Sequence, residues 1–518
     1  MSQTTVRSGL LAGSRWDGES WSAGWFAGTA GRAAVLDKGS GGVLAEVSLV
    51  SAAQVDRVVG QAVAAQPDWA ADGERRAVLL ERAAQLVEAH RDEFVTWIIR
   101  ESGSVTAKAN GEVSDAVTEL LVSAGHARAE LAVPVPRMPG ELLSTAERVP
   151  HGVVAVITPW NVPLVLALRS VAPALALGNA VVLKPDLQTP VSGGVLLARV
   201  FEQVGLPAAV FNLVVGNGPE VGEALVTSPG VSMVSFTGST ATGRAVAALA
   251  APLLKKLALE LGGKNPHVVL SDADLPAAAA AGVWGTFQHQ GQVCMAIGRH
   301  VVDSSVVDAY TDELVARVRL LRQGDPSRED VELGPVINER QAARIEAIIA
   351  DARDRGATVL VGGGRSGLYV QPTVLSGVRP GMRAYDEEVF GPVAVLIVAD
   401  GESDAIRIAN DTPYGLSASV HSRDAARAHM VADRIQSGMV HVNGQPINDN
   451  PWAPMGGIKA SGVGGRFGAV ADVEMFSTLR WRTVHDDTPQ GFFPSGLEPA
   501  GTRRRSRPND PDERSRDK

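Results

Sequence analysis

Residues 153–185 read VVAVITPWNVPLVLALRSVAPALALGNAVVLKP, and their pattern is the strongest indication of fold class in the sequence. It opens on a short apolar run, Val153–Thr158, and continues through an apolar segment of helical length over 164–177. It closes on a second apolar run, Ala180–Leu183. Short buried strands that alternate with helices of about 10 to 15 residues are typical of βαβ units around a parallel sheet. The stretch therefore predicts an α/β fold.

The chain on either side follows the same plan. Upstream, apolar residues recur at helical spacing over 51–66 and 75–99. Downstream, Gly262 and Gly263 interrupt an apolar stretch and mark the expected junction to a second α/β segment, which extends to about residue 435. The further expected elements are a helix over 190–204 and strands over 210–215, 231–236, 357–361 and 393–398.

The composition limits the class of protein. The 518 residues are 45% hydrophobic and 20% charged, which is ordinary globular composition. The net charge of −9 gives no electrostatic reason for nucleic-acid binding, and no apolar run is long enough to cross a membrane. A single cysteine and an N-terminus without the apolar core of a signal peptide predict a cytoplasmic protein. Residues 488–518, rich in Pro, Gly, Ser and charge, are expected to be disordered.

The single cysteine, Cys294, stands in the segment HQGQVCM, residues 289–295. Most cytosolic cysteines are buried structural thiols, so composition alone favours that role. A nucleophilic cysteine needs a helper, because a thiol with an ordinary pKa of about 8.5 is mostly protonated at neutral pH. The candidate helpers are His289 and a carboxylate from elsewhere in the chain.

The best candidate carboxylate is Glu260, which ends an apolar strand directly before two glycines. Burial raises the pKa of a carboxyl group and can turn it into a general base. The glycines allow backbone or ligand to approach closely. The alternative is a glutamate that ends the strand and pairs with Lys264 or Lys256.

Two loops follow strand ends, which is where open α/β sheets bind ligands. Asn161 can donate a hydrogen bond to a developing oxyanion, although a turn asparagine can also satisfy its own backbone. The loop FTGSTATG, residues 236–243, offers small residues at a helix N-terminus, where phosphate binds, but it lacks GxGxxG and Gly-Lys-Ser/Thr. Lys184 can contact an adenosine ribose or phosphate, or be solvated. With no HxxxH pair and one cysteine, no metal site is expected.

Taken together, these residues resemble the aldehyde dehydrogenase superfamily over about residues 10–487. Cys294 follows Glu260 by 34 positions, which is the separation usual in that family. The family's motifs occur in order as Thr158–Asn161, Gly178–Pro185, Phe236–Gly243, Glu260–Lys264, Gly291–Cys294, Glu387–Pro392 and Pro454–Gly457.

The resemblance implies a mechanism and a cofactor. Cys294 would attack an aldehyde, and the Asn161 amide and the Cys294 backbone N–H would hold the oxyanion. Glu260 would activate the water that hydrolyses the thioester left after hydride transfer to NAD. The implied NAD-binding residues are Ile157, Thr158, Trp160, Lys184, Phe236, Gly238, Ser239, Gly243, Leu261, Glu388 and Phe390.

The resemblance also implies a domain organisation. Residues 1–135 and 151–258 would form a dinucleotide-binding domain, and residues 259–435 a catalytic domain. Segments 136–150 and 470–487 resemble the family's bridging strands, which associate across subunits, so a homodimer or homotetramer is expected.

Three positions depart from the family pattern. Leu187 stands where many members have a glutamate on the adenosine ribose, and losing that charge makes NADP tolerable beside NAD. Ser170 stands where many relatives have a lysine that helps to relay protons. Phe467 follows Arg466 where an acidic residue is usual, so the route by which the proton leaves Glu260 stays open.

Other positions resemble the benzaldehyde dehydrogenases and related aromatic-aldehyde enzymes of the family. These positions are Arg169–Pro173, Lys184–Asp186, His289–Gln292 and Asn448–Asn450. Val162, Trp452 and Met455 are the candidates to line an apolar substrate pocket, although Trp452 can equally belong to the core. Arg169 beside such a pocket also allows an acidic substrate.

Three alternatives accompany oxidation of an aromatic aldehyde such as benzaldehyde. One is an aliphatic or semialdehyde dehydrogenase, or a relative that passes its thioester to coenzyme A. A second is a hydrolase without redox chemistry, built on Cys294 and His289. A third, a catalytically inactive structural relative, is disfavoured by the intact Cys294, Glu260 and Asn161.

Overall fold

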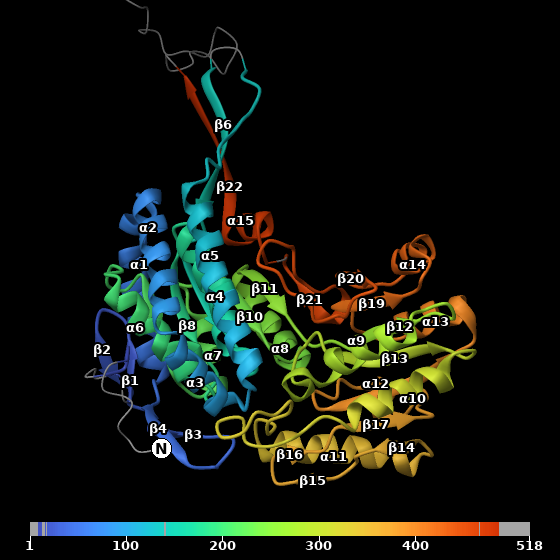
Figure 1. Ribbon diagram of the computed structural model, residues 1–518. Helices are drawn as coiled ribbons and strands as arrows, with labels where there is room; N and C mark the ends of the chain where they lie inside the picture. Colours follow the sequence, from blue (N-terminus) through green and yellow to red (C-terminus); the bar gives the residue numbers. More distant parts are fainter. Residues whose placement is uncertain (1–8, 13–15, 17, 139–140, 466, 486–518) are drawn as a thin grey trace, which may run out of the picture. The chain divides into compact units, whose positions relative to one another are not determined.

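The computed structural model describes residues 9–485 except 13–15, 17, 139–140 and 466 (Figure 1). The chain divides into two units. The larger comprises Met1–Ala129 with Val149–Thr478, and the smaller comprises Glu130–Arg148 with Leu479–Lys518. The predicted tail, 488–518, and Arg466 lie outside the described residues.

The first sheet of the larger unit has eight strands in the order β2-β1-β9-β8-β7-β10-β11-β21. Its five central strands, which are β9, β8, β7, β10 and β11, run parallel, as the alternating pattern predicts. The edges are antiparallel. The strands are β1 (Glu19–Trp21), β2 (Trp25–Ala27), β7 (Val153–Ile157), β8 (Ala180–Lys184), β9 (Phe211–Leu213), β10 (Met233–Thr237), β11 (Lys256–Glu260) and β21 (Gly462–Val463).

Helices cover this sheet because its central strands are apolar on both faces. Every residue of β7 and β8 is buried, and so is every residue of helix α5 (Pro163–Ala176), which begins with a proline at its first turn. Alternate strand residues such as Val153 and Ile157 pack with helix α1 (Ala52–Ala70) in one hydrophobic cluster. The other helices of this half are α2 (Gly73–Ala89), α3 (Arg91–Ser102), α4 (Thr106–Arg128), α6 (Leu196–Gln203), α7 (Gly218–Thr227) and α8 (Thr240–Ala250).

The second sheet has seven strands in the order β14-β17-β18-β13-β12-β19-β20, parallel except for the edge strand β14. Two hydrophobic clusters cover its faces. Its strands are β12 (Asn265–Val269), β13 (Ile297–Asp303), β14 (Thr358–Val361), β17 (Thr373–Ser376), β18 (Val393–Ala399), β19 (Ser417–His421) and β20 (Met439–Val442). Its helices include α9 (Leu275–Phe287), α10 (Val307–Val318), α11 (Glu339–Asp354), α12 (Arg383–Asp386), α13 (Gly401–Asn410) and α14 (Ala425–Ala432).

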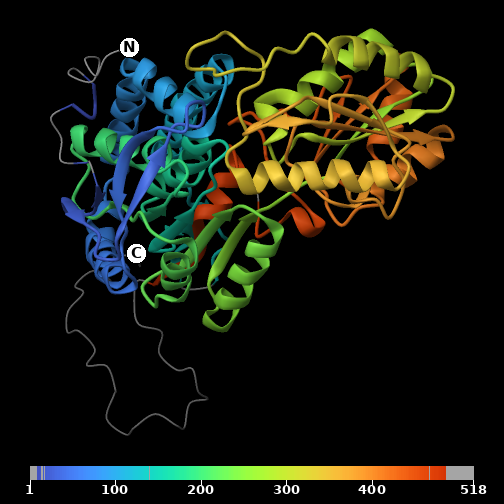
Figure 2. The same ribbon diagram turned by 90° about the horizontal axis from the view of Figure 1, so that it is seen from below.

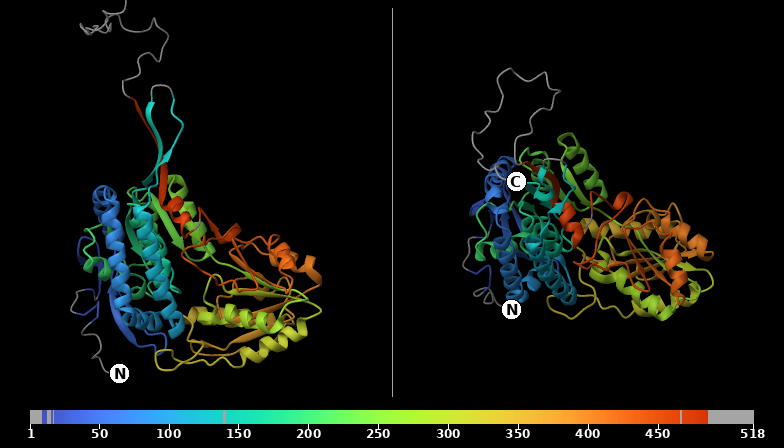
Figure 3. Two further views of the ribbon diagram at one scale, coloured as in Figure 1. Left: turned by 45° about the horizontal axis from the view of Figure 1, so that its top comes forward. Right: turned by 90° about the horizontal axis from the view of Figure 1, so that it is seen from above.

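The chain passes from the first sheet to the second at Gly262 and Gly263. Strand β11 ends at Glu260 in the first sheet, and β12 begins at Asn265 in the second. Figures 2 and 3 show the two halves of the larger unit side by side, the first in blue to green and the second in yellow to orange. The chain later returns to the first half, where β21 pairs with β11. These features confirm the predicted α/β class with two largely parallel sheets.

The smaller unit is built on a three-stranded sheet. Its order is β22-β6-β5, with β5 (Val133–Pro134), β6 (Glu141–Pro150) and β22 (Ser477–His485). Arg480 and Arg482 both pair with Glu147, at 3.3 and 2.8 Å. The exposed apolar side chains of this unit are Val133, Met138, Leu142, Leu143, Leu479, Trp481 and Val484.

One segment differs from its prediction. Residues 470–476, which the sequence placed with the bridging strands, form helix α15 (Val470–Phe476). Asp472, Met475 and Phe476 are its buried residues, and this spacing of three and four matches a helix rather than a strand. The Asp472 carboxylate also accepts a hydrogen bond from the Gly468 N–H at 2.9 Å, just before the helix.

A fully buried asparagine joins three segments of the larger unit. The side-chain oxygen of Asn179 accepts hydrogen bonds from the backbone N–H groups of His151 and Gly152, at 2.7 and 3.1 Å. Its amide nitrogen donates to the carbonyls of Ala174 and Phe476, at 3.0 and 2.8 Å. Asn179 thereby connects the start of β7, the end of α5 and the end of α15.

We expect Asn179→Ala to lower the free energy of unfolding by about 3 kcal/mol or more. The half-buried N–H groups of His151 and Gly152 and the buried Phe476 carbonyl lose a hydrogen bond, and each buried polar group left without a partner costs about 1–3 kcal/mol. Urea unfolding measures the change. The control is Asn110→Ala, because that amide binds only the Thr106 carbonyl one turn away near solvent, and its cost should be within about 0.5 kcal/mol. Equal losses in the two variants would contradict the assignment.

Candidate active site

The loop before Cys294 follows an unusual backbone path. His289, Gln290 and Gly291 are consecutive left-handed residues, with φ of 49°, 57° and 69°. Such a conformation costs about 1 kcal/mol or more for a residue with a side chain, so tertiary contacts must hold it. The Gln290 amide supplies two of them, donating to the carbonyls of Gly103 and Pro335 at 2.9 and 2.8 Å. Strain of this kind is typical of functional loops.

Cys294 is half-buried, and its backbone is fixed from the second sheet. The Asn265 amide donates to the carbonyls of Cys294 and Ala296, at 2.8 and 2.7 Å. Behind it passes the link between the sheets, where a Cβ added at Gly263 would lie 2.5 Å from the Cys294 oxygen. A Cβ added at Gly262 would lie 2.4 Å from a carboxylate oxygen of Glu388. Gly263 is therefore required by the close approach of backbone, as expected from the sequence, whereas Gly262 leaves room for the end of the Glu388 side chain.

Asn161 lies against the same loop. Its side chain is buried, and its amide nitrogen donates to the Gln292 carbonyl at 2.9 Å. Gln292 is itself anchored, because its side-chain oxygen accepts a hydrogen bond from the Ile337 N–H at 3.0 Å. An amide carries two N–H donors, and the bond to Gln292 uses one of them. The second donor forms no hydrogen bond to the residues that the structure describes.

Glu260 ends β11 and is 4% exposed. One carboxylate oxygen accepts a hydrogen bond from the Gly457 N–H at 3.2 Å, and the Glu260 carbonyl accepts one from Gly238 at 3.0 Å. The alternative partner Lys264 is buried and donates to the carbonyl of Ala384 at 2.7 Å. Burial lowers the pKa of Lys264 to about 7.

Several carboxylates lie near enough to Cys294 to change the pKa of its thiol. Burial raises the pKa of the Cys294 thiol to about 12, and the carboxylates of Glu388, Glu260 and Asp449 add to the increase. Arg169 opposes it. The thiol is therefore protonated at neutral pH in the free protein, and its proton must be removed for it to react.

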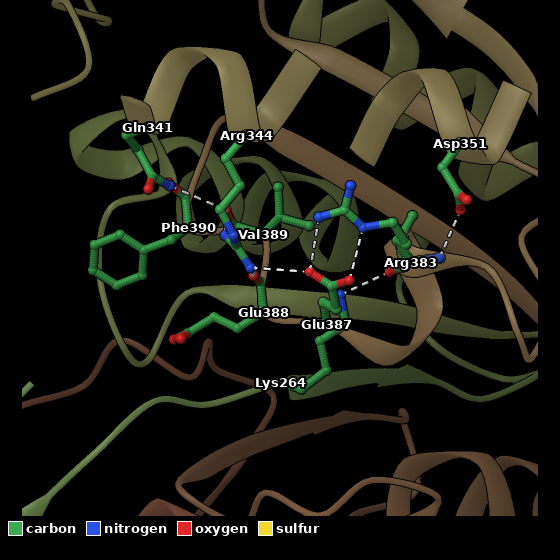
Figure 4. Close-up of polar contacts among 10 residues, drawn as sticks. Lys264, Gln341, Arg344, Asp351, Arg383, Glu387, Glu388, Val389 and Phe390 are labelled. Carbon is green, nitrogen blue, oxygen red and sulfur yellow. Dashed lines mark hydrogen bonds and ion pairs between the residues drawn. The ribbon is translucent and has the colours of Figure 1, made fainter. Parts of the chain in front are cut away.

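Helix α11 holds the loop that contains Glu388 and Phe390 (Figure 4). Arg344 donates to the carbonyls of Glu388 and Val389, at 2.7 and 2.9 Å, and Gln341 donates to the Phe390 carbonyl at 2.8 Å. The Glu388 carboxylate accepts a hydrogen bond from the Gly263 N–H at 3.0 Å, and burial raises its pKa to about 7. The loop is thus fixed through its backbone.

Phe390 has a left-handed backbone, with φ of 55°. Its ring meets the Trp160 ring edge to face, with centroids 5.5 Å apart and an interplanar angle of 88°. This contact joins the loop of the second half to the loop that follows β7. The predicted cofactor residues Trp160 and Phe390 therefore lie together.

The remaining predicted cofactor residues follow the carboxyl ends of parallel strands. Ile157 pairs with Lys184 and Phe236, and Thr237 pairs with Glu260, so these ends share one edge of the sheet. The hydroxyl of Thr158 is buried and has no hydrogen-bond partner among the described residues. Lys184 is buried and donates to the Pro185 carbonyl at 3.1 Å, and burial lowers its pKa.

The loop after β10 begins helix α8. Ser239 caps the helix, because its hydroxyl accepts a hydrogen bond from the Thr242 N–H at 3.2 Å. A Cβ added at Gly243 would lie 2.4 Å from a methyl group of Leu261, and one added at Gly238 would lie 2.6 Å from the Phe236 ring. These glycines allow the loop and helix to pack directly on the strand ends. The arrangement fits a dinucleotide phosphate at the helix N-terminus.

The pocket candidates occupy different environments. Val162 is half-buried and precedes α5 directly after Asn161. Met455 is buried and exchanges backbone hydrogen bonds with Phe467. Trp452 is 64% exposed, which excludes a place in the core.

The neighbours of the site include buried polar side chains. Arg169 is buried and forms ion pairs with Glu119, at 3.4 Å, and with Asp449. The Ser170 hydroxyl lies 2.8 Å from that of Ser235. His289 faces Ser104, with its Nδ1 3.3 Å from the hydroxyl, and burial followed by Lys108 lowers its pKa well below the usual range. A neutral, buried His289 is a poor base for a thiol.

Several residues that hold the site cannot be recognised from local sequence patterns. The side chains of Asn265, Gln292 and Arg344 form hydrogen bonds with backbone groups that are distant in the sequence, and no local motif predicts such contacts. Lys108 and Glu112, four positions apart, look like an ordinary surface ion pair on a helix, but their side chains are 7% and 1% exposed. A buried pair of this kind is recognisable only once the fold is known.

In the part of the chain that the structure describes, no cluster of three or more His, Cys, Asp or Glu side chains could hold a metal ion. No helix in the same part is long and apolar enough to cross a membrane.

Comparison with known proteins agrees with this geometry. The model of the aldehyde dehydrogenase family matches residues 25–482. Benzaldehyde dehydrogenase [NAD(+)] of Pseudomonas putida is 45% identical over 467 residues, which cover 90% of this chain and 96% of that protein. Vanillin dehydrogenase of Amycolatopsis sp. is 44% identical over 485 residues, which cover 92% of this chain and 98% of that protein.

A solved structure agrees as well. A mutant of aldehyde dehydrogenase C from Pseudomonas syringae, in complex with NAD+ and octanal, superposes with a TM-score of 0.86 at 37% identity. The match covers 90% of this chain and 96% of that one. Since both the family model and these relatives span most of its length, the chain belongs to the aldehyde dehydrogenase family.

Proposed function

We propose that this protein oxidises aromatic aldehydes, such as benzaldehyde, to carboxylic acids with NAD. The observation that carries the proposal is the hydrogen bond from the Asn161 amide to the Gln292 carbonyl, which holds an oxyanion donor against the Cys294 loop. The carboxylate of Glu260 lies in the same electrostatic neighbourhood. The benzaldehyde and vanillin dehydrogenases among its relatives support the aromatic substrate.

NAD fits the edge of the first sheet, where it would supply the hydride acceptor. Lys184 and Thr158 would contact its adenosine half. Lys184 is a buried cation, and the buried Thr158 hydroxyl has no hydrogen-bond partner among the described residues. Leu187 offers no carboxylate to repel a 2′-phosphate, so NADP should also be accepted. The other residues we propose to hold NAD are Ile157, Trp160, Phe236, Gly238, Ser239, Gly243, Leu261, Glu388 and Phe390.

Cys294 would act as the nucleophile. Its sulfur would form a bond to the aldehyde carbon as the carbonyl electrons move onto oxygen, giving a thiohemiacetal after the thiol proton leaves. The Asn161 amide and the Cys294 backbone N–H would bind the oxyanion, and one such donor is typically worth about 3–4 kcal/mol in the transition state. Deprotonation and attack must be coupled, since the thiol is protonated at neutral pH.

Glu260 would act on the second half of the reaction. After oxidation the acyl group is a thioester on Cys294, and its hydrolysis requires water to lose a proton. The Glu260 carboxylate, buried at the end of β11, would accept that proton as a general base. The products would be the carboxylic acid and the free thiol.

A neutral aromatic substrate fits better than an acidic one. The charge of Arg169 is balanced by the carboxylates of Glu119 and Asp449, so it offers little attraction to a substrate carboxylate. Val162, Met455 and Trp452 remain our candidates for the apolar lining of the pocket. The alternatives are aliphatic aldehydes, semialdehydes or transfer to coenzyme A.

The halves of the chain and its assembly can be proposed in the same way. The half built on the first sheet would bind the dinucleotide, and the half built on the second would carry the nucleophile. The exposed apolar residues of the smaller unit, including Leu142 and Trp481, would be covered in a homodimer or homotetramer. The free catalytic thiol fits a reducing compartment such as the cytoplasm.

A substrate panel tests the aromatic assignment. We expect kcat/KM for benzaldehyde to exceed that for hexanal and for succinate semialdehyde by at least about tenfold, because an apolar pocket discriminates by about 1–3 kcal/mol. NADH and NADPH absorbance would be followed with each cofactor. Benzaldehyde turned over no better than the other two would remove the aromatic assignment.

Glu260→Gln should separate the two halves of the reaction. We expect a burst of about one equivalent of NADH per active site followed by a stall, because the thioester forms but water is no longer activated. Stopped-flow absorbance measures the burst. Cys294→Ala is the control and should show neither phase, whereas undiminished steady turnover of Glu260→Gln would exclude Glu260 as the hydrolytic base.

The raised pKa of Cys294 predicts the pH dependence of its alkylation in the free enzyme. Iodoacetamide reacts with the thiolate, so the rate of inactivation should rise about tenfold per pH unit from pH 7 to 10 without levelling off. A thiol with an ordinary pKa of about 8.5 would level off near pH 9 instead. Such a plateau would contradict the electrostatic description of the site.

The carboxylates offer a control for that experiment. Glu388→Gln removes a charge that raises the thiol pKa, so alkylation at pH 8 should become faster. Glu387→Gln is the matched variant, because Glu387 is neutralised by Arg383 and Arg344 and is not among the charges that act on the thiol.

A further inference from the structure

Two buried charged side chains of helix α4 contact Asn161 and the start of α5. Lys108 and Glu112 lie one helical turn apart, with Nζ 2.5 Å from a carboxylate oxygen. Their side chains are 7% and 1% exposed. A buried ion pair is on average a poor source of stability, because desolvation offsets its attraction, so what else these charges contact is the informative question.

Glu112 caps the helix that follows Asn161. Its second carboxylate oxygen accepts a hydrogen bond from the Leu164 N–H at 2.8 Å, and the Val165 N–H lies 3.4 Å away. The residue at the N-cap position, Val162, contributes no side-chain hydrogen bond. A carboxylate from another helix thus satisfies buried N–H groups at the start of α5 that have no partner within the helix, and negative charge there is also favoured by the helix dipole.

Lys108 holds Asn161 itself. Its ammonium group donates to the Asn161 carbonyl at 3.0 Å while it pairs with Glu112. The side-chain amide of Asn161 donates a separate hydrogen bond to the Gln292 carbonyl at 2.9 Å. Asn161 is therefore fixed through its backbone from α4 and through its side chain from the nucleophile loop, and the helix that begins just after it is capped from α4 as well.

We propose that Lys108 and Glu112 are positioning residues of the reaction, which hold the Asn161 amide where the oxyanion forms. They touch Asn161 and the start of α5 and act only through them. The inference rests on the proposed function, in which the Asn161 amide binds the oxyanion. Displacing a donor by a fraction of an ångström weakens it sharply, because a hydrogen bond to a developing charge requires a short distance and good alignment.

A double-mutant cycle tests the proposal. Lys108→Met should slow the single-turnover formation of NADH by about 10-fold or more, while KM for NAD changes by less than about twofold, since loss of a whole oxyanion donor costs about 100- to 1000-fold. In an Asn161→Ala background the same change should have an effect of less than about twofold, because the amide that it positions is gone. Lys108→Arg, which keeps the charge and the donor, should recover most of the rate.

Two outcomes would overturn the proposal, and they are distinguishable. If the rate losses of Lys108→Met and Asn161→Ala multiply in the double variant, the lysine acts on the fold rather than on the amide. If Asn161→Ala leaves the rate unchanged, the oxyanion role in the proposed function fails, and the positioning role fails with it.

Matched variants exclude a general loss of structure. Lys255→Met removes another lysine that donates to a backbone carbonyl, that of Ser228, and should leave the rate unchanged. Glu112→Gln keeps the shape and an acceptor oxygen, so it should fold even if Lys108→Met does not. Its smaller rate loss should likewise vanish in the Asn161→Ala background, and persistence of the loss there would overturn the proposal.

Discussion

The link between the two sheets passes Cys294 at Gly263, where the space is too narrow for a side chain. A Cβ at Gly263 would lie 2.5 Å from the Cys294 carbonyl oxygen, and one at Gly262 would meet the Glu388 carboxylate. Because this link is short and closely packed, the end of β11 with Glu260 is tied to the loop that carries Cys294. The Glu388 loop, held by helix α11, closes on the same glycines. Both halves of the larger unit therefore meet at one pair of residues without side chains.

Buried charge dominates the chemistry around this point. Burial raises the pKa of the Cys294 thiol, and the carboxylates of Glu388, Glu260 and Asp449 raise it further, so the thiol is protonated at neutral pH. The charges that could attract a substrate are balanced internally, as in the pairs of Arg169 with Glu119 and of Lys108 with Glu112. These charged side chains near Cys294 are thus held by protein partners, which favours preorganised positions.

Much of this protein could be predicted from local patterns. The apolar runs around 153–185 correspond to β7, α5 and β8, and the order of motifs identified the family. The role of Cys294 as nucleophile stays a prediction of the same motifs. The prediction of a strand was wrong at residues 470–476, because the local sequence pattern there does not distinguish a helix from a strand. Local patterns also gave no account of how Asn161 is held, since Lys108 lies 53 positions earlier and Gln292 lies 131 positions later.

The α/β class and the family follow from the amino-acid sequence alone, because the period of the apolar residues and the order of side-chain types are properties of the chain. The partners that hold those side chains are set by the packing of the folded chain. Gln290 fixes a left-handed loop through Gly103 and Pro335, and Glu112 caps a helix more than fifty positions away. Such contacts have no signature in a linear pattern, because they join backbone groups whose proximity is created by the packing of helices and sheets.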